Sequence, residues 1–200
     1  MSTNTATLVS TICQWISDLR GETTADTSAN RIRAISRAEQ DFAKRKLWRV
    51  FYIKDQSTTA TSGNDYEVGS ATYPMRNKGL AEVFVDGTTE DKRCAIVDFN
   101  VFKNIYNRNN AYPMVYEWYD AANDLWKMHM NPAPEADVTI THSYFWEPPA
   151  RTLTTEKVIC PNPVIIVKLA MADIADSEDD PDTANQLRQE VEQLIQELAG

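Results

Sequence analysis

The hydrophobic residues of this chain change their spacing twice, and this change limits the folds that it can adopt. At both ends the apolar residues recur every three or four positions, which is the period of an α-helix. From Trp48 to about Phe145 the helical period is lost, and β-branched and aromatic residues occur in short runs between Gly, Asn, Asp and Pro. This order predicts an α+β fold in which the two ends of the chain meet in one helical layer.

We therefore expect two parts. Residues 1–48 and 160–200 are predicted to form a helical bundle, and residues 49–159 an inserted antiparallel β module. The chain has 200 residues, of which 42% are hydrophobic, so it can bury a substantial core.

Two helices are predicted before Trp48. The first ends near Gly21, and its apolar residues follow one helix face: Leu8, Ile12, Trp15, Ile16 and Leu19. The second begins after an N-cap at Thr27 or Ser28 and runs to about Leu47. At about 100° per residue its apolar and basic residues fall on opposite sides: Ile32, Ile35, Ala38 and Phe42 on one, and Arg33, Arg37 and Lys44 on the other.

The middle region predicts six strands and one short helix. The strands are expected at 49–53, 81–85, 94–99, 113–119, 125–130 and 138–145, and the helix around Phe102, Ile105 and Tyr106. The polar stretch QSTTATSGND is expected to be a mobile loop, with residues 57–64 exchanging their amide hydrogens rapidly. The aromatic residues of this region favour a core, although a sugar-binding platform or interface anchors are alternatives.

Two closing helices follow the CPNP run at 160–163. The first, from Val164 to about Ala175, is apolar nearly all round, so burial on most sides is expected. The second opens at Asp180–Pro181 and carries a narrow apolar stripe for pairing with another helix. The stripe comprises Leu187, Val191, Leu194, Ile195 and Leu198.

Charge is distributed unevenly along the chain. The formal net charge is −9, yet residues 1–50 hold 8 basic and 5 acidic side chains, whereas residues 151–200 hold 4 and 10. A basic stripe lies on and after the second helix: Arg31, Arg33, Arg37, Lys44, Arg45, Lys46 and Arg49. It is interpreted either as a solvated face or as a contact with an acidic surface of a neighbouring subunit; contact with nucleic acid is a weaker alternative, because few aromatics accompany these charges.

Motifs for catalysis and for cofactor or metal binding are missing from the sequence. It contains no GxGxxG, GxxxxGK[ST], GxSxG or HExxH, and His129 and His142 lie at no ligand spacing. The acidic segment after Ala172 lacks the inner ligands and the glycine of a calcium loop. Cys13, Cys94 and Cys160 are expected to be buried thiols, and no apolar run reaches the ~20 residues that cross a bilayer. We therefore expect no enzyme, no cofactor, no metal and no membrane contact.

Three segments resemble the head-to-tail connector (adaptor) proteins of tailed bacteriophages. The first is the opening amphipathic helix followed by the basic second helix that ends in LWRVFY. The other two are the central segment YPMVYEWYDAANDLWKMHMNPAPEADVTITHSYFWEPP and the junction CPNPVIIVKLAMADIADSEDDPD into the two closing helices. The resemblance covers most of the chain and rests on the order of these patterns. It implies a helical bundle with an inserted β module and no catalysis. It also implies a homo-oligomeric ring, commonly of twelve copies, that binds the portal protein on one side and tail or nozzle proteins on the other while the double-stranded DNA genome passes through.

The function expected from this resemblance is that of a structural virion protein in the neck between capsid and tail, assembled in the host cytoplasm. Two surfaces are predicted to contact other subunits or the portal, namely the basic residues Arg33, Arg37, Lys44 and Arg45, and the terminal stripe Leu187, Val191, Leu194 and Leu198. A tail-completion or stopper protein is the nearest alternative. A carbohydrate-binding adhesin module is an alternative of a different class.

Overall fold

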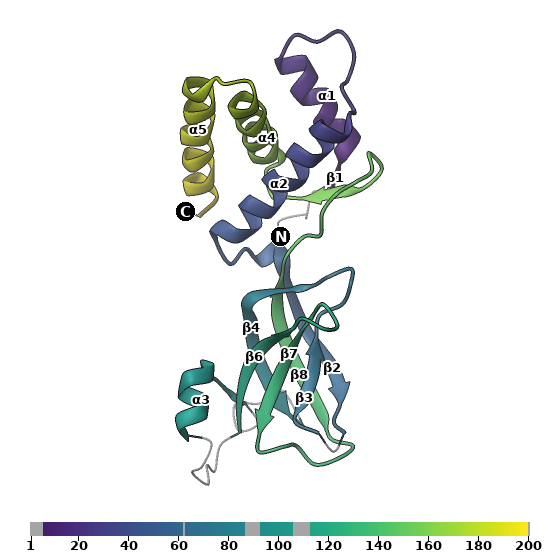
Figure 1. The fold of residues 1–200 in the computed structure, drawn as a ribbon, viewed down its shortest axis with the longest axis vertical. Coiled ribbons are helices and arrows are strands. Elements are labelled where there is room, and N and C mark those ends of the chain that lie inside the picture. The colour runs from purple at the N-terminus through teal and green to yellow at the C-terminus, as the bar shows by residue number, and fades with distance from the viewer. Residues whose placement is uncertain (1–5, 62, 87–92, 106–112, 200) are drawn as a thin grey trace. The chain divides into compact units, whose positions relative to one another are not determined.

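The computed structural model describes residues 6–61, 63–86, 93–105 and 113–199, and has the mixed α+β composition expected from the sequence. The chain divides into two compact units (Figure 1). Unit 1 comprises residues 1–50 and 148–200, and unit 2 comprises residues 51–147. Residues 148–159, expected in the β module, group with the helices instead, because a strand within this segment pairs with the start of the chain.

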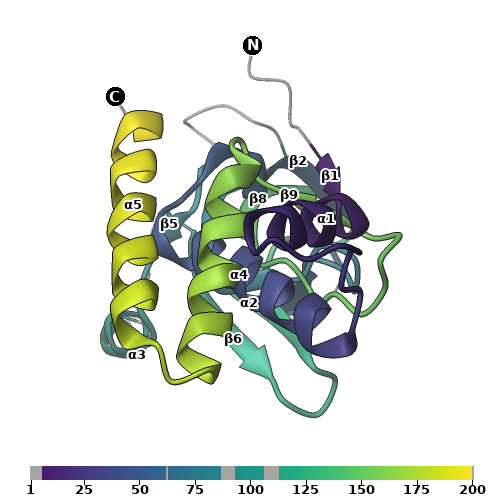
Figure 2. The ribbon, with the colours of Figure 1, turned by 90° about the horizontal axis from the view of Figure 1, so that it is seen from above.

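Unit 1 combines four helices with a small two-stranded sheet. Its elements are β1 (Ala6–Leu8), α1 (Val9–Leu19), α2 (Ala29–Arg45), β9 (Lys157–Ile159), α4 (Pro163–Ser177) and α5 (Pro181–Ala199). Strands β1 and β9 pair antiparallel, with Thr7 opposite Val158. Viewed from above, α4 lies between α5 and α1, and it also packs on α2 (Figure 2).

Helix α4 forms the centre of unit 1 because its sequence is apolar on nearly every side. Seven of its fifteen residues are buried, including Ile165, Ile166 and Val167, which confirms the expected burial in part, and Val164 in its first turn is exposed. Helix α1 buries Ile12 and Ile16, but Trp15 and Leu19 are 37% and 66% exposed. The single apolar face expected for this helix is thus wider than the surface that it packs against α2 and α4.

The described residues of unit 2 form two sheets and one helix. A short 3-10 turn, η1 (Arg49–Phe51), leads into it. One sheet has the order β2–β8–β4, and the other has the order β3–β7–β6–β5. Their strands are β2 (Tyr52–Thr59), β3 (Asp65–Val68), β4 (Met75–Val85), β5 (Ala95–Ile96), β6 (Met114–Asp120), β7 (Leu125–Asn131) and β8 (Thr139–Trp146), and the helix is α3 (Phe99–Ile105).

The strand expectations are confirmed for β6, β7 and β8, and residues 81–85 form the second half of β4. The strand expected from residue 49 begins only at Tyr52, because Arg49–Phe51 form η1. The expected mobile loop is wrong in its first half, because residues 57–59 continue β2 and pair with β8, where Ser57 lies opposite Thr141. Strand β5 is shorter than expected and runs parallel to β6. The helix expected around Phe102 is present as α3, whereas Tyr106 lies outside the described residues.

Candidate interaction surfaces

The basic face of α2 is positioned by burial of the opposite face. Ser28 caps the helix, because its hydroxyl accepts a hydrogen bond from the backbone N–H of Arg31 at 3.3 Å. Ile35 and Phe42 are fully buried, so Arg33 and Arg37 lie on the outer side. The N-cap and the two-sided pattern expected from the sequence are therefore both confirmed. Lys44 and Arg45 in the last turn are exposed as well.

Acidic residues of the same unit partly neutralise this basic face. Arg37 Nη1 lies 3.6 Å from Asp173 Oδ2 of α4, and Arg45 pairs with Asp41 at 2.7 Å and with Glu192 of α5. These acidic partners lie on the chain itself, so the face is not solely a solvated one, and contact with a neighbouring subunit stays a prediction.

Arg31 does not belong to the outer stripe in which the sequence placed it. It is buried, and its guanidinium contacts Glu22 at 3.0 Å and Asp26 at 3.3 Å. Ser17 on α1 donates a hydrogen bond to Glu22 at 2.6 Å, so this cluster joins α1 to the start of α2. Its role is to hold the two helices together.

A hollow of about 360 Å³ lies beside Arg33 and Arg37. It runs along α2 from Ala29 to Gln40 and is closed on its other side by residues 150–152. An adjoining hollow shares Arg33 and Arg37 but also contains the carboxylates of Asp173 and Glu178. The two arginines therefore lie between two hollows. All charged side chains in the lining of the first are basic, whereas the second has both basic and acidic side chains.

A buried ion pair fixes the wall of the first hollow. Glu39 of α2 is 0% exposed, and its carboxylate accepts hydrogen bonds from Arg151 Nε at 2.7 Å and from the backbone N–H of Ile159 at 2.8 Å. The hydroxyl of Ser36 accepts a further bond from the backbone N–H of Arg151 at 2.9 Å. These contacts hold the 148–152 segment against α2.

Glu39 was missed at the sequence level, although the sequence contains a signal for it. It lies four residues after Ile35 and seven after Ile32, which places a carboxylate on the apolar face of α2. A carboxylate in that position requires a buried cation or several N–H donors.

The terminal stripe of α5 is used largely within unit 1. Val191 is 0% exposed, and Leu187 packs against the cluster of Ala172, Ala175 and Ala184. Leu194 is half-buried, and Leu198 is 40% exposed. The stripe therefore pairs with α4 of the same chain, and Leu198 is its most exposed member.

The turn between α4 and α5 is acidic and exposed. Residues 176–183 are all exposed, and several of their carboxylates already have partners. Asp180 Oδ1 accepts the backbone N–H of Thr183 at 3.1 Å and so caps α5, as the sequence predicted. Glu178 pairs at 2.7 Å with Arg20, which follows the last residue of α1, and Asp176 pairs with Arg188 of α5.

The aromatic residues of unit 2 divide between core and surface. Tyr144 and Trp146 are buried, as the core interpretation requires, whereas Tyr119 is exposed and Trp118 half-buried. Tyr112 lies outside the described residues.

Trp118 belongs to a polar cluster on the outer side of β3, β7 and β6. Its Nε1 donates to Asp65 Oδ1 at 3.1 Å, and the same oxygen lies 2.8 Å from His129 Nδ1. Lys127 Nζ stands 5.6 Å from the Trp118 ring centre and pairs with Asp120 at 2.7 Å. The Lys127 ammonium, with the Asn123 amide, lowers the pKa of Asp120 to about 2.

Burial shifts the pKa of a histidine and of a glutamate in unit 2. His142 is 5% exposed on β8, and burial lowers its pKa to about 4. Glu117 on β6 accepts a hydrogen bond from the backbone N–H of Leu80 at 3.0 Å, and burial raises its pKa. The described part of the chain contains no cluster of three or more His, Cys, Asp or Glu side chains able to hold a metal ion.

The cysteines are buried and free, as expected. Burial raises the pKa of Cys94 to about 11 and that of Cys160 to about 12, so both remain protonated thiols near neutral pH.

No family model matches the chain, and no curated protein matches it. Among the described residues, no helix has the length and apolar character needed to cross a bilayer.

Proposed function

We propose that this chain is a structural protein of a bacteriophage neck, where it forms a ring that joins the portal to the tail and lets the genome pass. In this proposal the helices of both chain ends make the bundle of the connector, and the strands form its inserted antiparallel β module. The ring has twelve copies, contacts the portal on one side, and contacts tail or nozzle proteins on the other.

One observation carries the proposal: residues from both ends of the chain make up one helical unit, while the residues between them make up a separate β-rich unit. This division agrees with the layout that the resemblance to connectors implies. The outward position of Arg33 and Arg37 adds support, because it leaves cationic side chains available to another protein.

The excess of acidic over basic side chains also supports a ring through which DNA passes. A formal net charge of −9 repels phosphate groups, so passing DNA would not adhere to the ring. A protein that grips DNA requires the opposite balance.

The test is genetic and structural. Particles assembled without this chain should retain the portal but lack the tail, as seen by cryo-electron microscopy, and the chain should be found by mass spectrometry in complete particles. The native mass of the purified chain should increase to that of a ring when the portal protein of the same genome is added. Complete, tailed particles assembled without the chain would refute the proposal.

The same images distinguish a stopper or tail-completion protein. Loss of a stopper should leave a ring of connector density still bound to the portal, whereas loss of the connector should leave the portal bare.

A carbohydrate-binding module is the second candidate function, favoured by the cluster around Trp118. A half-buried indole beside the carboxylate of Asp65 and the ammonium of Lys127 offers a stacking surface and hydrogen-bonding groups to a sugar ring. Binding of the full chain to a glycan array, lost in Trp118→Ala and retained in Tyr119→Ala, would support this candidate. An array without binding would remove it.

A further inference from the structure

The hollow beside Arg33 and Arg37 is positively charged on a chain whose formal net charge is −9. Its lining contains three arginines and no Asp or Glu. Glu39 neutralises Arg151 at 2.7 Å. Arg33, in contrast, forms no ion pair within the described residues, and the Arg37 side chain is 66% exposed at 3.6 Å from Asp173. Two guanidinium groups are therefore available to a negatively charged occupant.

The shape of the hollow favours a peptide segment over a small anion. The stretch of α2 from Ala29 to Gln40 that lines it is about 16 Å long. Ala29, Ile32 and Ala150 contribute apolar surface to the lining. A bare phosphate would leave this apolar surface in contact with water, whereas a peptide turn would cover it.

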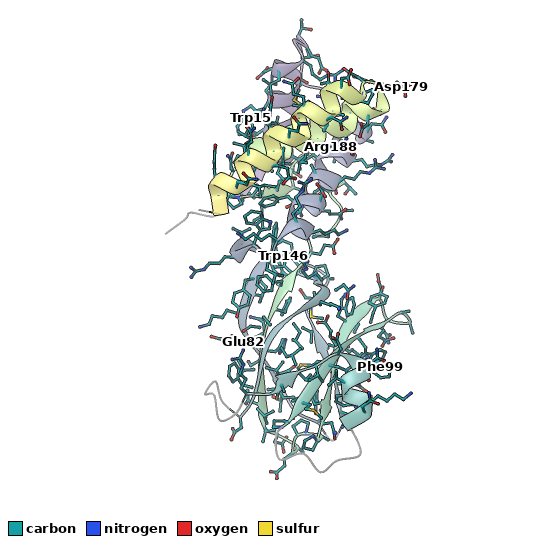
Figure 3. The ribbon with its side chains drawn as sticks, turned by 90° about the vertical axis from the view of Figure 1, so that its left-hand side faces the viewer. Trp15, Glu82, Phe99, Trp146, Asp179 and Arg188 are labelled. Carbon is teal, nitrogen blue, oxygen red and sulfur yellow. The ribbon has the colours of Figure 1, made fainter. Side chains whose placement is uncertain are left out.

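The turn between α4 and α5 has the complementary charge and an exposed position. Asp179 and Asp182 form no ion pair in the described part of the chain, and Asp179 lies at the tip of the turn (Figure 3). The backbone N–H of Asp180 donates to the carbonyl of Ala175 at 3.0 Å, which closes the end of α4. The turn therefore keeps its shape before it meets a partner, so little conformational entropy is lost on binding.

We propose that the hollow of one copy receives the acidic turn of a second copy of this chain, with Asp179 and Asp182 facing Arg33 and Arg37 of the neighbour. This inference rests on the proposed function, because it assigns the surfaces through which copies of the ring meet. Charge complementarity between two exposed parts of one chain carries the assignment.

DNA is a poorer occupant of the hollow for an electrostatic reason. Asp173 and Glu178 line the adjoining hollow together with Arg33 and Arg37, so a duplex placed on the two arginines would also meet these carboxylates. A compact protein turn can enter the positive hollow without covering the adjoining one.

The experiment is a charge exchange between two variants of the full chain. One variant carries Arg33→Glu and Arg37→Glu, and the other carries Asp179→Lys and Asp182→Lys. Sedimentation velocity at low and high salt measures self-association, and circular dichroism checks that each variant is folded. A control variant, Lys54→Glu with Lys78→Glu, changes the net charge by the same amount as the arginine variant, on exposed side chains of unit 2.

We expect the wild type to associate, more weakly as salt increases, and the control to behave like the wild type. For each exchanged variant alone, the dissociation constant of self-association should rise at least about tenfold, because two attractive charge pairs between copies become repulsive. An equimolar mixture of the two variants should recover association, because the acidic hollow of one then faces the basic turn of the other.

Three outcomes would overturn the inference. Association that neither variant weakens, or that the mixture does not recover, would assign the contact to another surface and leave the ring proposal standing. A wild-type protein that stays monomeric both alone and with the portal would refute both the proposed contact and the proposed ring. Binding of a DNA duplex through Arg33 and Arg37, without self-association, would assign the hollow to nucleic acid.

Discussion

His142 should make the stability of unit 2 depend on pH, and the size of the effect follows from its burial. The imidazole is 5% exposed on β8, the central strand of the β2–β8–β4 sheet. Within the described residues its Nδ1 has no hydrogen-bond partner. Burial lowers its pKa from the ordinary 6.5 to about 4, because the charged imidazolium would lose its hydration.

The sign follows from proton binding in the two states. Below about pH 6.5 the unfolded chain protonates His142, while the folded chain does not until about pH 4. The stabilisation by the neutral imidazole is therefore complete above the unfolded pKa and is lost as the pH falls toward the folded pKa. This pKa shift contributes at most about 3 kcal/mol to the free energy of unfolding, and about 2 kcal/mol of that contribution is lost between about pH 7 and about pH 5.

Hydrogen exchange of the slowest amides in β8 measures this change directly. The chain has only two histidines, so the background variant His129→Gln leaves His142 as the sole imidazole. In that background, opening of β8 should become about 20-fold more frequent at about pH 5 than at about pH 7, after correction for intrinsic exchange rates. Adding His142→Gln should remove the part of this change that belongs to His142, while the titration of the carboxylates stays common to both proteins.

Equal pH dependence in the proteins with and without His142 would refute the reasoning. It would mean that His142 reaches solvent or a partner group in the folded state.

Three further predictions concern single side chains of unit 1. Glu39→Ala should lower the free energy of unfolding by about 3 kcal/mol, because it leaves Arg151 half-buried without its partner. In urea unfolding, the double variant Glu39→Leu with Arg151→Met should recover most of this loss. An equal loss in both proteins would contradict the ion-pair explanation. Asp179→Gly should raise the free energy of unfolding by about 1 kcal/mol, because Asp179 has a φ of 60°, which glycine adopts more easily. Gly21→Ala, at a φ of 71°, should lower it by a similar amount, and calorimetry that shows the reverse order would exclude the backbone explanation. Ser28→Ala should lower the free energy of unfolding by about 1 kcal/mol, because the N-cap of α2 is lost, whereas Ser28→Asp should keep the wild-type melting temperature. An unchanged melting temperature in Ser28→Ala would show that the cap does not stabilise the protein.

Periodicity predicted the elements whose burial is one-sided or complete. The 3.6-residue period placed Ile32, Ile35 and Phe42 inside α2, and the continuous apolar run at Ile165–Val167 indicated the buried centre of unit 1. Strands β6 and β8 were equally recognisable, because β-branched and aromatic residues make up most of each. Strand β7 has few such residues, and it was recognised from the turn residues that precede it.

Elements stabilised by distant partners could not be predicted in this way. The residues Ser57–Thr59 are polar, and they form a strand because β8 provides a ladder for them. The short β9 exists through its pairing with β1, about 150 residues away in the chain.

The candidate surfaces were predicted only in part for the same reason. Arg33 and Arg37 were correctly placed outside, but no sequence pattern indicated that Arg31 is buried beside Glu22, or that Arg151 reaches Glu39. Such pairs depend on which segments become neighbours in space, and local patterns carry no such information.

The division of unit 1 between the two ends of the chain has a consequence for synthesis on the ribosome. Ile12, Ile35 and Phe42 emerge with the first fifty residues, yet α4, which helps to enclose them, emerges only after the whole of unit 2 has been made. During that interval unit 2 can fold by itself, while α1 and α2 keep apolar surface open to chaperones or to aggregation. The synthesis of α4 therefore decides when the apolar side chains of α1 and α2 become protected.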